Sequence, residues 1–144
     1  MLSLEESLKI LKETNALLEG HFILSSGLNS TQYVQCAKLM SKPEKAHKIC
    51  ASLSEKIINE FKDFDLVLSP AIGGIVIGYE IGRLLKKETI FSERVDGKFV
   101  LRRDFLIKKN QRVVVVEDVI TTGKSSLECS NIIQKMGGKI VGYA

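Results

Sequence analysis

The sequence lacks the features that mark several classes of protein. Its three cysteines form neither a Cys-x-x-Cys motif nor a Cys/His ligand spacing, which argues against a disulfide scaffold and a zinc site. No apolar run approaches the ~20 residues that a membrane span needs, and the acidic residues Glu5 and Glu6 stand where a signal peptide is basic. Its ordinary composition, 44% hydrophobic and 26% charged, excludes disordered and collagen-like chains. We therefore expect a cytoplasmic globular protein with reduced, buried cysteines and no membrane contact.

The positive charge is also unevenly distributed. Residues 83–112 hold ten basic residues, including all five arginines, and four acidic ones, which leaves +6 in this segment. The rest of the chain holds eleven basic and thirteen acidic residues, which leaves −2. A nucleic-acid binder carries its basic residues over a whole face, so we expect no nucleic-acid partner. The local segment suits a small anionic ligand such as a phosphate, or else it is a solvated surface.

Hydrophobic patterning divides the 144 residues, a length typical of one domain, into alternating helices and strands. Ser3 and Glu6 form a capping box for a first helix that Gly20 is expected to end. The dipeptide Asp96–Gly97 predicts a type I′ hairpin, and the alternation after residue 65 predicts parallel βαβ units. The expected helices cover 4–20, 41–61, 75–87 and 125–136, and the expected strands cover 21–27, 30–36, 66–68, 89–93, 98–102, 112–116 and 139–143.

The most informative stretch follows the run of four valines at 113–116. Two carboxylates, Glu117 and Asp118, are followed by Thr121, Thr122 and Gly123 and then by a predicted helix. Ligands of open α/β sheets bind beyond the carboxyl ends of the strands, and a helix N-terminus there can hold a phosphate. The carboxylates suit sugar hydroxyls or a cation that bridges to a diphosphate. The pattern thus predicts a ribose 5-phosphate site, with a capped turn and two solvated acids as the alternative.

Residues 113–126 resemble the phosphoribosyl diphosphate (PRPP) signature of type I phosphoribosyltransferases. Segments 20–27, 30–36, 69–74 and 91–103 resemble the orotate phosphoribosyltransferases, in the same order along the chain. The resemblance implies a three-layer α/β fold, in which helices cover both faces of a mostly parallel twisted sheet. It also implies a small hood over residues 1–40, a core over 41–144 and a mobile hairpin loop at about 93–103.

The implied reaction is the magnesium-dependent transfer of 5-phosphoribosyl from PRPP to orotate, which yields orotidine 5′-phosphate and diphosphate in pyrimidine biosynthesis. A homodimer is implied as well. The alternatives are a phosphoribosyltransferase for another base, or a PRPP-binding fragment or regulator without turnover. Family members continue beyond the position of Ala144 with more of the sheet and an arginine-bearing segment, so we expect the natural domain to continue there.

The resemblance also assigns residues to roles. Arg94, Lys98 and Asp118 are implied to be catalytic, while Mg²⁺ enters through PRPP without an assigned protein ligand. Some branches of the family carry lysines in place of Ser25 and Gly73. Without those lysines, the resemblance implies that Arg94, Lys98 and backbone donors neutralise the charge of the diphosphate. The residues implied to bind PRPP are Gly73, Gly74, Arg94, Lys98, Glu117, Asp118, Val119, Ile120, Thr121, Thr122, Gly123, Lys124 and Ser125. Those implied to bind orotate are Ser25, Ser26, Gly27, Tyr33 and Thr121, with a plain core position as the alternative for Tyr33.

Overall fold

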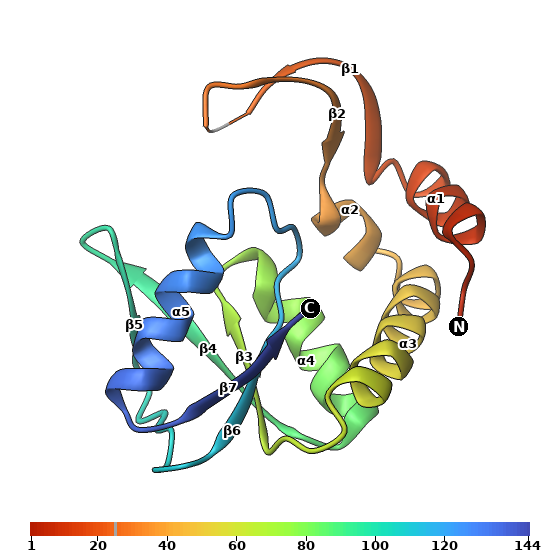
Figure 1. The fold of residues 1–144 in the computed structure, drawn as a ribbon. Coiled ribbons are helices and arrows are strands. Elements are labelled where there is room, and N and C mark those ends of the chain that lie inside the picture. Colours follow the sequence, from red (N-terminus) through yellow and green to blue (C-terminus); the bar gives the residue numbers. More distant parts are fainter. Residues whose placement is uncertain (25) are drawn as a thin grey trace. The chain divides into compact units, whose positions relative to one another are not determined.

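A computed structural model describes residues 1–24 and 26–144 and divides them into two compact units. The first unit is Met1–Ile49 and the second is Cys50–Ala144; Figure 1 shows the elements of each. Ser25, one of the residues implied to bind orotate, lies outside the described residues. Within the described part of the chain, no helix is long and apolar enough to cross a membrane.

The first unit is a small helical cluster with a two-stranded ribbon. Its core is formed by Ile10, Ala16, Leu39 and Ala46, which are at most 8% exposed. The capping box is confirmed, because the backbone N–H of Glu6 donates to Ser3 Oγ and that of Ser3 donates to the Glu6 carboxylate. The elements are α1 (Leu4–Glu13), β1 (Leu17–Ile23), β2 (Asn29–Val34), α2 (Cys36–Met40) and the start of α3 (Pro43–Glu60), and β1 pairs with β2 in antiparallel fashion.

The predicted end of the first helix at Gly20 is wrong. The helix ends at Glu13 because Asn15 adopts a left-handed conformation with φ of 54°. The backbone N–H groups of Asn15 and Ala16 donate to the carbonyls of Lys12 and Leu11, at 3.0 and 2.8 Å. This is the Schellman pattern, which satisfies the last carbonyls of a helix. Gly20 therefore lies inside β1, and the strand predicted over 30–36 ends at Val34 because a short helix follows it.

The second unit contains a five-stranded sheet in the order β5-β4-β3-β6-β7. The pairs β3–β4, β3–β6 and β6–β7 are parallel, and within this sheet β5 pairs with β4 in antiparallel fashion, so the predicted mostly parallel α/β sheet is confirmed. The hairpin turn is also as predicted, with φ of 49° at Asp96 and 78° at Gly97. After the end of α3, the elements are β3 (Leu66–Pro70), α4 (Gly73–Leu85), β4 (Glu88–Val95), β5 (Lys98–Leu101), β6 (Arg112–Val115), α5 (Lys124–Lys135) and β7 (Lys139–Tyr143).

Helices cover both faces of this sheet. Leu66 and Leu68 pack in one apolar cluster with Cys129 and Ile133 of α5. The side chain of Ser69 points to the opposite face of the sheet from those of Leu66 and Leu68, and it packs against Gly78 of α4. The strands are therefore buried on both sides, which explains why the four valines at 113–116 are at most 1% exposed. All three cysteines are free and buried, as expected.

Gly78 allows α4 to approach the sheet closely. A Cβ at this position would lie 2.8 Å from Cβ of Ser69 and would also overlap the Ser69 hydroxyl. We expect Gly78→Ala to lower the free energy of unfolding by about 1–3 kcal/mol, the usual cost of overpacking, as measured by urea denaturation. Gly20→Ala is the control, because its added Cβ would meet atoms only at an ordinary 3.4 Å. Equal losses in both variants would contradict the packing argument.

Candidate functional site

The acid pair stands where three parallel strands end. Leu66 of β3 is paired with Val113 of β6, and the ladder continues beyond the last paired residue, since the N–H of Val116 donates to the carbonyl of Leu68 at 2.9 Å. The N–H of Glu117 donates to the carbonyl of Ala144 beyond β7, also at 2.9 Å. Glu117 and Asp118 are thereby held at the carboxyl edge of the sheet, as the sequence predicted.

Asp118 lies directly against the start of α4. A Cβ added at Gly73 would be 2.6 Å from the Asp118 Cγ and closer still to Oδ2. Gly73 is the first residue of α4, and Ile72, which precedes it, is joined to Ala71 by a cis peptide bond. The loop after β6 and the turn after β3, which the sequence assigned to one PRPP site, are therefore adjacent in the second unit. The absence of a side chain at Gly73 is what allows the carboxylate this position.

Glu117 differs from Asp118 in its surroundings. It is partly buried, and the hydroxyl of Ser126, a buried residue of α5, donates to its Oε1. Burial raises the pKa of Glu117 and the neighbouring Asp118 charge adds to the rise, while the hydrogen bond from Ser126 lowers the pKa in part. Glu117 is thus fixed to α5 through Ser126.

The raised pKa of Glu117 predicts a pH-dependent stability. The folded state binds this proton more tightly than the unfolded chain, so the free energy of unfolding should fall as pH rises through the raised pKa. Glu117→Gln cannot ionise and should escape this loss, so its stability relative to wild type should increase from about pH 4 to about pH 7. Ser126→Ala removes the hydrogen bond and should move the decline to higher pH. Urea denaturation across this range tests both, and a pH-independent difference would contradict them.

The loop before α5 offers backbone donors to an anion. Gly123 adopts φ of 74° and has no side chain to cap the helix, while the N–H of Lys124, the first helical residue, donates to Oγ1 of Thr122 at 3.4 Å. The first amides of a helix have no carbonyl within it to bond, and the helix dipole adds partial positive charge there. Thr121 and Thr122 are exposed beside them. These donors suit a phosphate, and the binding of one here stays a prediction.

The described residues contain no cluster of three or more His, Cys, Asp or Glu side chains that could hold a metal ion by itself. Glu117 and Asp118 nevertheless supply hard carboxylate oxygens at one place. Mg²⁺ is typically bound by one or two carboxylates together with substrate phosphates and waters. The residues therefore fit a magnesium ion that arrives with a polyphosphate ligand.

Arg94 and Lys98 flank the turn of the β4–β5 hairpin. The guanidinium of Arg94 pairs with the carboxylate of Glu128 on α5 at 3.1 Å and donates to the carbonyl of Gly97 at 2.6 Å. Its Cζ lies 4.0 Å from the centre of the Phe99 ring. Lys98 lines a groove between this hairpin and α5, together with Lys124 and Glu128. The structure thus brings Arg94 and Lys98 beside α5, the helix that follows the loop at residues 117–123.

The remaining residues implied to bind orotate belong to the first unit. Ser26 and Gly27 lie in the turn between β1 and β2, where Gly27 has φ of 81°. Tyr33 is 39% exposed on β2 and stacks on Phe22, with ring centroids 5.6 Å apart. Tyr33 is therefore not a plain core residue. The role of these residues toward a ligand stays a prediction.

Two partners of the site residues were missed from the sequence. Ser126 bonds Glu117, and helical spacing within α5 could have indicated its buried position. Glu128 pairs with Arg94 from 34 residues away, and no local pattern indicates that contact. Both lie on α5, which therefore organises the site through more than its first turn.

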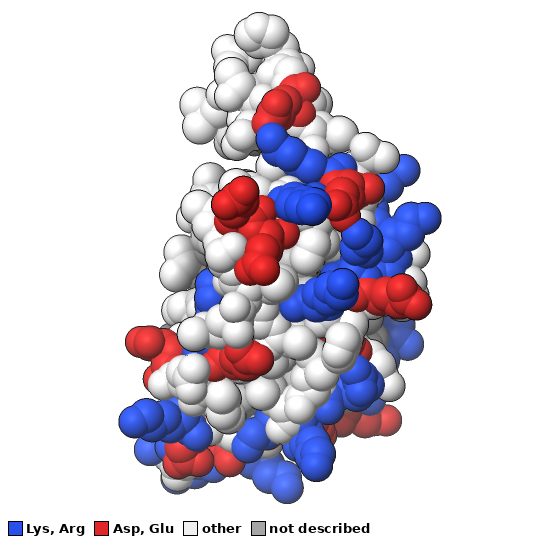
Figure 2. All heavy atoms as spheres, turned by 90° about the vertical axis from the view of Figure 1, so that its right-hand side faces the viewer, with Lys and Arg blue, Asp and Glu red and all other residues white. Residues whose placement is uncertain are grey.

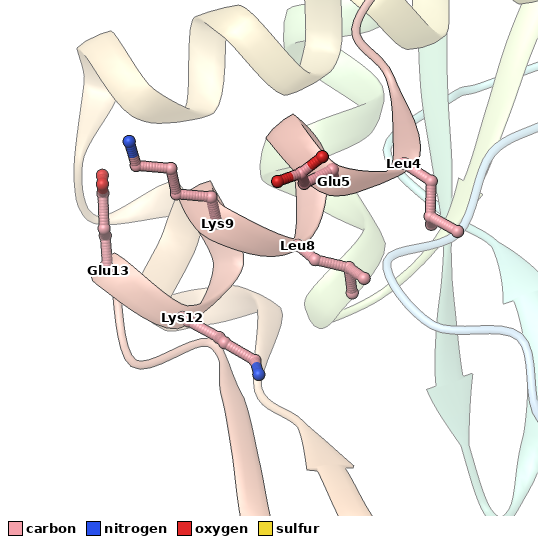
Figure 3. A pocket seen from close by; sticks show the side chains of 6 residues that line it. All are labelled: Leu4, Glu5, Leu8, Lys9, Lys12 and Glu13. Atoms are coloured by element: carbon pink, nitrogen blue, oxygen red, sulfur yellow. The ribbon is translucent and has the colours of Figure 1, made fainter.

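A separate pocket lies along α1, with Leu4 and Leu8 on one side of the helix and Lys9 and Glu13 projecting from another (Figure 3). Glu13 pairs with Lys45, and Lys12 pairs with Glu19 at 2.9 Å. The charged groups of this pocket are therefore largely neutralised by neighbours. None of the residues that the sequence assigned to ligands lines it, so we do not regard it as the functional site.

Known proteins resemble this chain over most of its length. Residues 40–144 match the family model described as the phosphoribosyl transferase domain. A curated orotate phosphoribosyltransferase of Carboxydothermus hydrogenoformans is 48% identical over 136 residues, which cover 94% of this chain and 71% of the relative. The crystal structure of orotate phosphoribosyltransferase from Aeropyrum pernix superposes with a TM-score of 0.77 at 26% identity, covering 92% of this chain and 75% of that one. The UMP synthase of Leishmania donovani has the same fold, with a TM-score of 0.80 at 22% identity, covering 96% of this chain and 30% of that one.

Proposed function

Since the chain belongs to the phosphoribosyl transferase domain family, we propose that it is an orotate phosphoribosyltransferase that uses PRPP in pyrimidine biosynthesis. The observation that carries the proposal is the contact of Asp118 with the backbone of Gly73. This contact places Glu117 and Asp118, the acid pair that we assign to the ribose hydroxyls, near the N-termini of α4 and α5 at one edge of the sheet. The 48% identity to the curated relative supports orotate as the base.

In this proposal the two helix starts divide the negative charge of PRPP between them. The amides and hydroxyls of residues 121–125 bind the 5′-phosphate, and the turn at 71–74 provides backbone donors to the diphosphate. Asp118 and Glu117 accept hydrogen bonds from the ribose hydroxyls. The sugar is thereby held at both ends, which orients its C1 toward the base before reaction.

Bond breaking at C1 leaves positive charge on the ribose and negative charge on the departing diphosphate. Orotate is already an anion, so no strong general base is needed for its N1. The chain's contribution is therefore positioning and neutralisation of the leaving group. Arg94 and Lys98 supply that neutralising charge from the hairpin, and closure of the hairpin excludes water from the reacting atoms.

Magnesium, when bound with PRPP, supplies additional positive charge to the diphosphate. Glu117 and Asp118 are the residues that offer oxygen ligands or hydrogen-bonded water positions to such an ion. The closeness of Asp118 to Gly73 places this carboxylate beside the backbone donors of the turn. The protein therefore needs no preformed metal cage of its own.

The test is consumption of orotate in the presence of PRPP and Mg²⁺, followed by ultraviolet absorbance, with release of one diphosphate per orotate. Adenine, hypoxanthine and uracil serve as competing bases. Consumption of another base but not orotate would move the function to that base. PRPP binding by calorimetry without turnover of any base would indicate a binding fragment or regulator.

A regulator that acts on RNA needs a continuous basic surface. On the face drawn in Figure 2, basic and acidic side chains are interspersed instead. Several exposed basic side chains are also paired, such as Arg83 with Glu80 and Arg103 with Glu93. These pairings favour the enzyme over the RNA-binding alternative.

We further propose that the chain acts as a homodimer in which the hairpin serves the partner's site. Ile72, which precedes α4, and Val76 and Tyr79 within it are 53–85% exposed, where a solvated helix usually carries polar side chains. Sedimentation should detect the dimer. Mixing Arg94→Ala with Asp118→Asn should restore activity beyond that of either variant, because one hybrid site then has both groups. No recovery in a mixed dimer would place the hairpin in its own subunit's site.

A further inference from the structure

The guanidinium of Arg94 is occupied within its own chain. Its Nη1 donates to the carbonyl of Gly97 at 2.6 Å and to Glu128 Oε2 at 3.1 Å, while its Nη2 reaches Glu128 Oε1 at 3.4 Å. The face of the guanidinium lies over the ring of Phe99 at 4.0 Å. Together these contacts direct the arginine toward α5.

Of these partners, Glu128 alone lies outside the hairpin. Gly97 forms the turn and Phe99 belongs to β5, so both travel with Arg94 if the hairpin moves as one piece. Glu128 stays behind on α5, one helical turn after Lys124. The Arg94–Glu128 pair is therefore the contact of the Arg94 guanidinium that must break when the hairpin leaves this position. Its carboxylate is the more buried partner, with 24% of the Glu128 side chain exposed against 39% for Arg94.

We propose that Glu128 is a positioning residue that holds Arg94 in a resting place and competes with the diphosphate of PRPP for it. The inference rests on the proposed function, which assigns Arg94 to the diphosphate. A guanidinium binds a carboxylate and a phosphate through the same N–H groups, so it cannot serve both fully. The apparent affinity for PRPP is then reduced by the fraction of molecules in which Arg94 is bound to Glu128.

The proposal predicts a gain from breaking the pair. Glu128→Gln keeps the size of the side chain and removes its charge. We expect its KM for PRPP to fall by about two- to fivefold, the range for loss of a partly exposed ion pair, with kcat within about twofold of wild type. Glu93→Gln is the matched control, because Glu93 lies on the same hairpin and binds Arg103 through two hydrogen bonds at 2.9 and 3.0 Å. Its KM for PRPP should stay at the wild-type value.

Two further measurements separate competition from a structural effect. In an Arg94→Ala background, Glu128→Gln should no longer change the KM for PRPP, because the guanidinium for which Glu128 and the diphosphate compete is gone. Hydrogen exchange of the hairpin amides should accelerate in Glu128→Gln and not in the control. An unchanged or raised KM would overturn the proposal even if the hairpin exchanges faster, because Glu128 would then only anchor it.

A failure of the proposed function has a different signature. If wild type turns over no base, binding of inorganic diphosphate by calorimetry replaces the kinetic measurement. The proposal then expects Glu128→Gln to bind diphosphate about two- to fivefold more tightly than wild type and the control. Equal binding by all three proteins would overturn the role of Glu128 independently of the reaction catalysed.

Discussion

Asp118→Asn should weaken PRPP binding by about 10- to 100-fold, because it removes the charge from hydrogen bonds worth about 1.5–3 kcal/mol each. The substitution keeps the shape of the side chain beside Gly73, so the fold should survive. Titration calorimetry of PRPP with Mg²⁺ measures the effect directly. Asp104→Asn, the same chemical change in an exposed loop between β5 and β6, is the control and should bind normally. Equal affinity of Asp118→Asn and wild type would reject the diol role.

Gly73→Ala tests the same contact from the other side. Its new Cβ would overlap the carboxylate of Asp118, which then has to move away from α4. PRPP affinity should therefore fall although both carboxylates remain. If Gly73→Ala binds PRPP like wild type, the position of Asp118 beside the turn is not important for the ligand.

Arg94→Ala should lower kcat by about 10²–10³, the usual effect of removing one donor to charge that develops in the transition state. Arg94 is the arginine of the hairpin turn, and the turn at 71–74 carries no lysine that could replace it. Steady-state turnover of orotate at saturating PRPP measures the loss. Arg83→Ala is the control, because it removes an exposed arginine of α4 that pairs with Glu80 at 2.8 Å. Unchanged turnover in Arg94→Ala would remove Arg94 from the catalytic residues.

These two substitutions separate binding from catalysis. In the proposed function Asp118 bonds hydroxyls that are present in bound PRPP, so its loss should appear mainly in affinity. In the proposed function Arg94 binds the diphosphate and also meets the charge that grows as it departs, so its loss should lower kcat as well as the affinity for PRPP. In Arg94→Ala the ion pair with Glu128 is lost as well, which makes kcat at saturating PRPP the cleaner measure.

The elements predicted correctly are those with local signals. Asp96–Gly97 specifies its turn because both residues tolerate positive φ, and Pro43 marks the start of α3 because its ring suits the first helical turn. The end of α1 was predicted wrongly because Leu18 continues the apolar spacing while Asn15 interrupts the backbone. The five-residue helix α2 was missed because it is too short to show a helical period.

The sequence by itself determined the chemistry of the loop after β6 and its position at the end of a strand. Four valines, two acids and a Thr-Thr-Gly turn follow one another closely in the sequence, so they must also lie close together in the folded chain. Only the tertiary structure decided which distant groups meet that loop. The contact of Asp118 with Gly73 requires β3 and β6 to be neighbours, and that of Arg94 with Glu128 requires the hairpin to lie along α5. Such contacts depend on sheet order and helix packing, which no local pattern encodes.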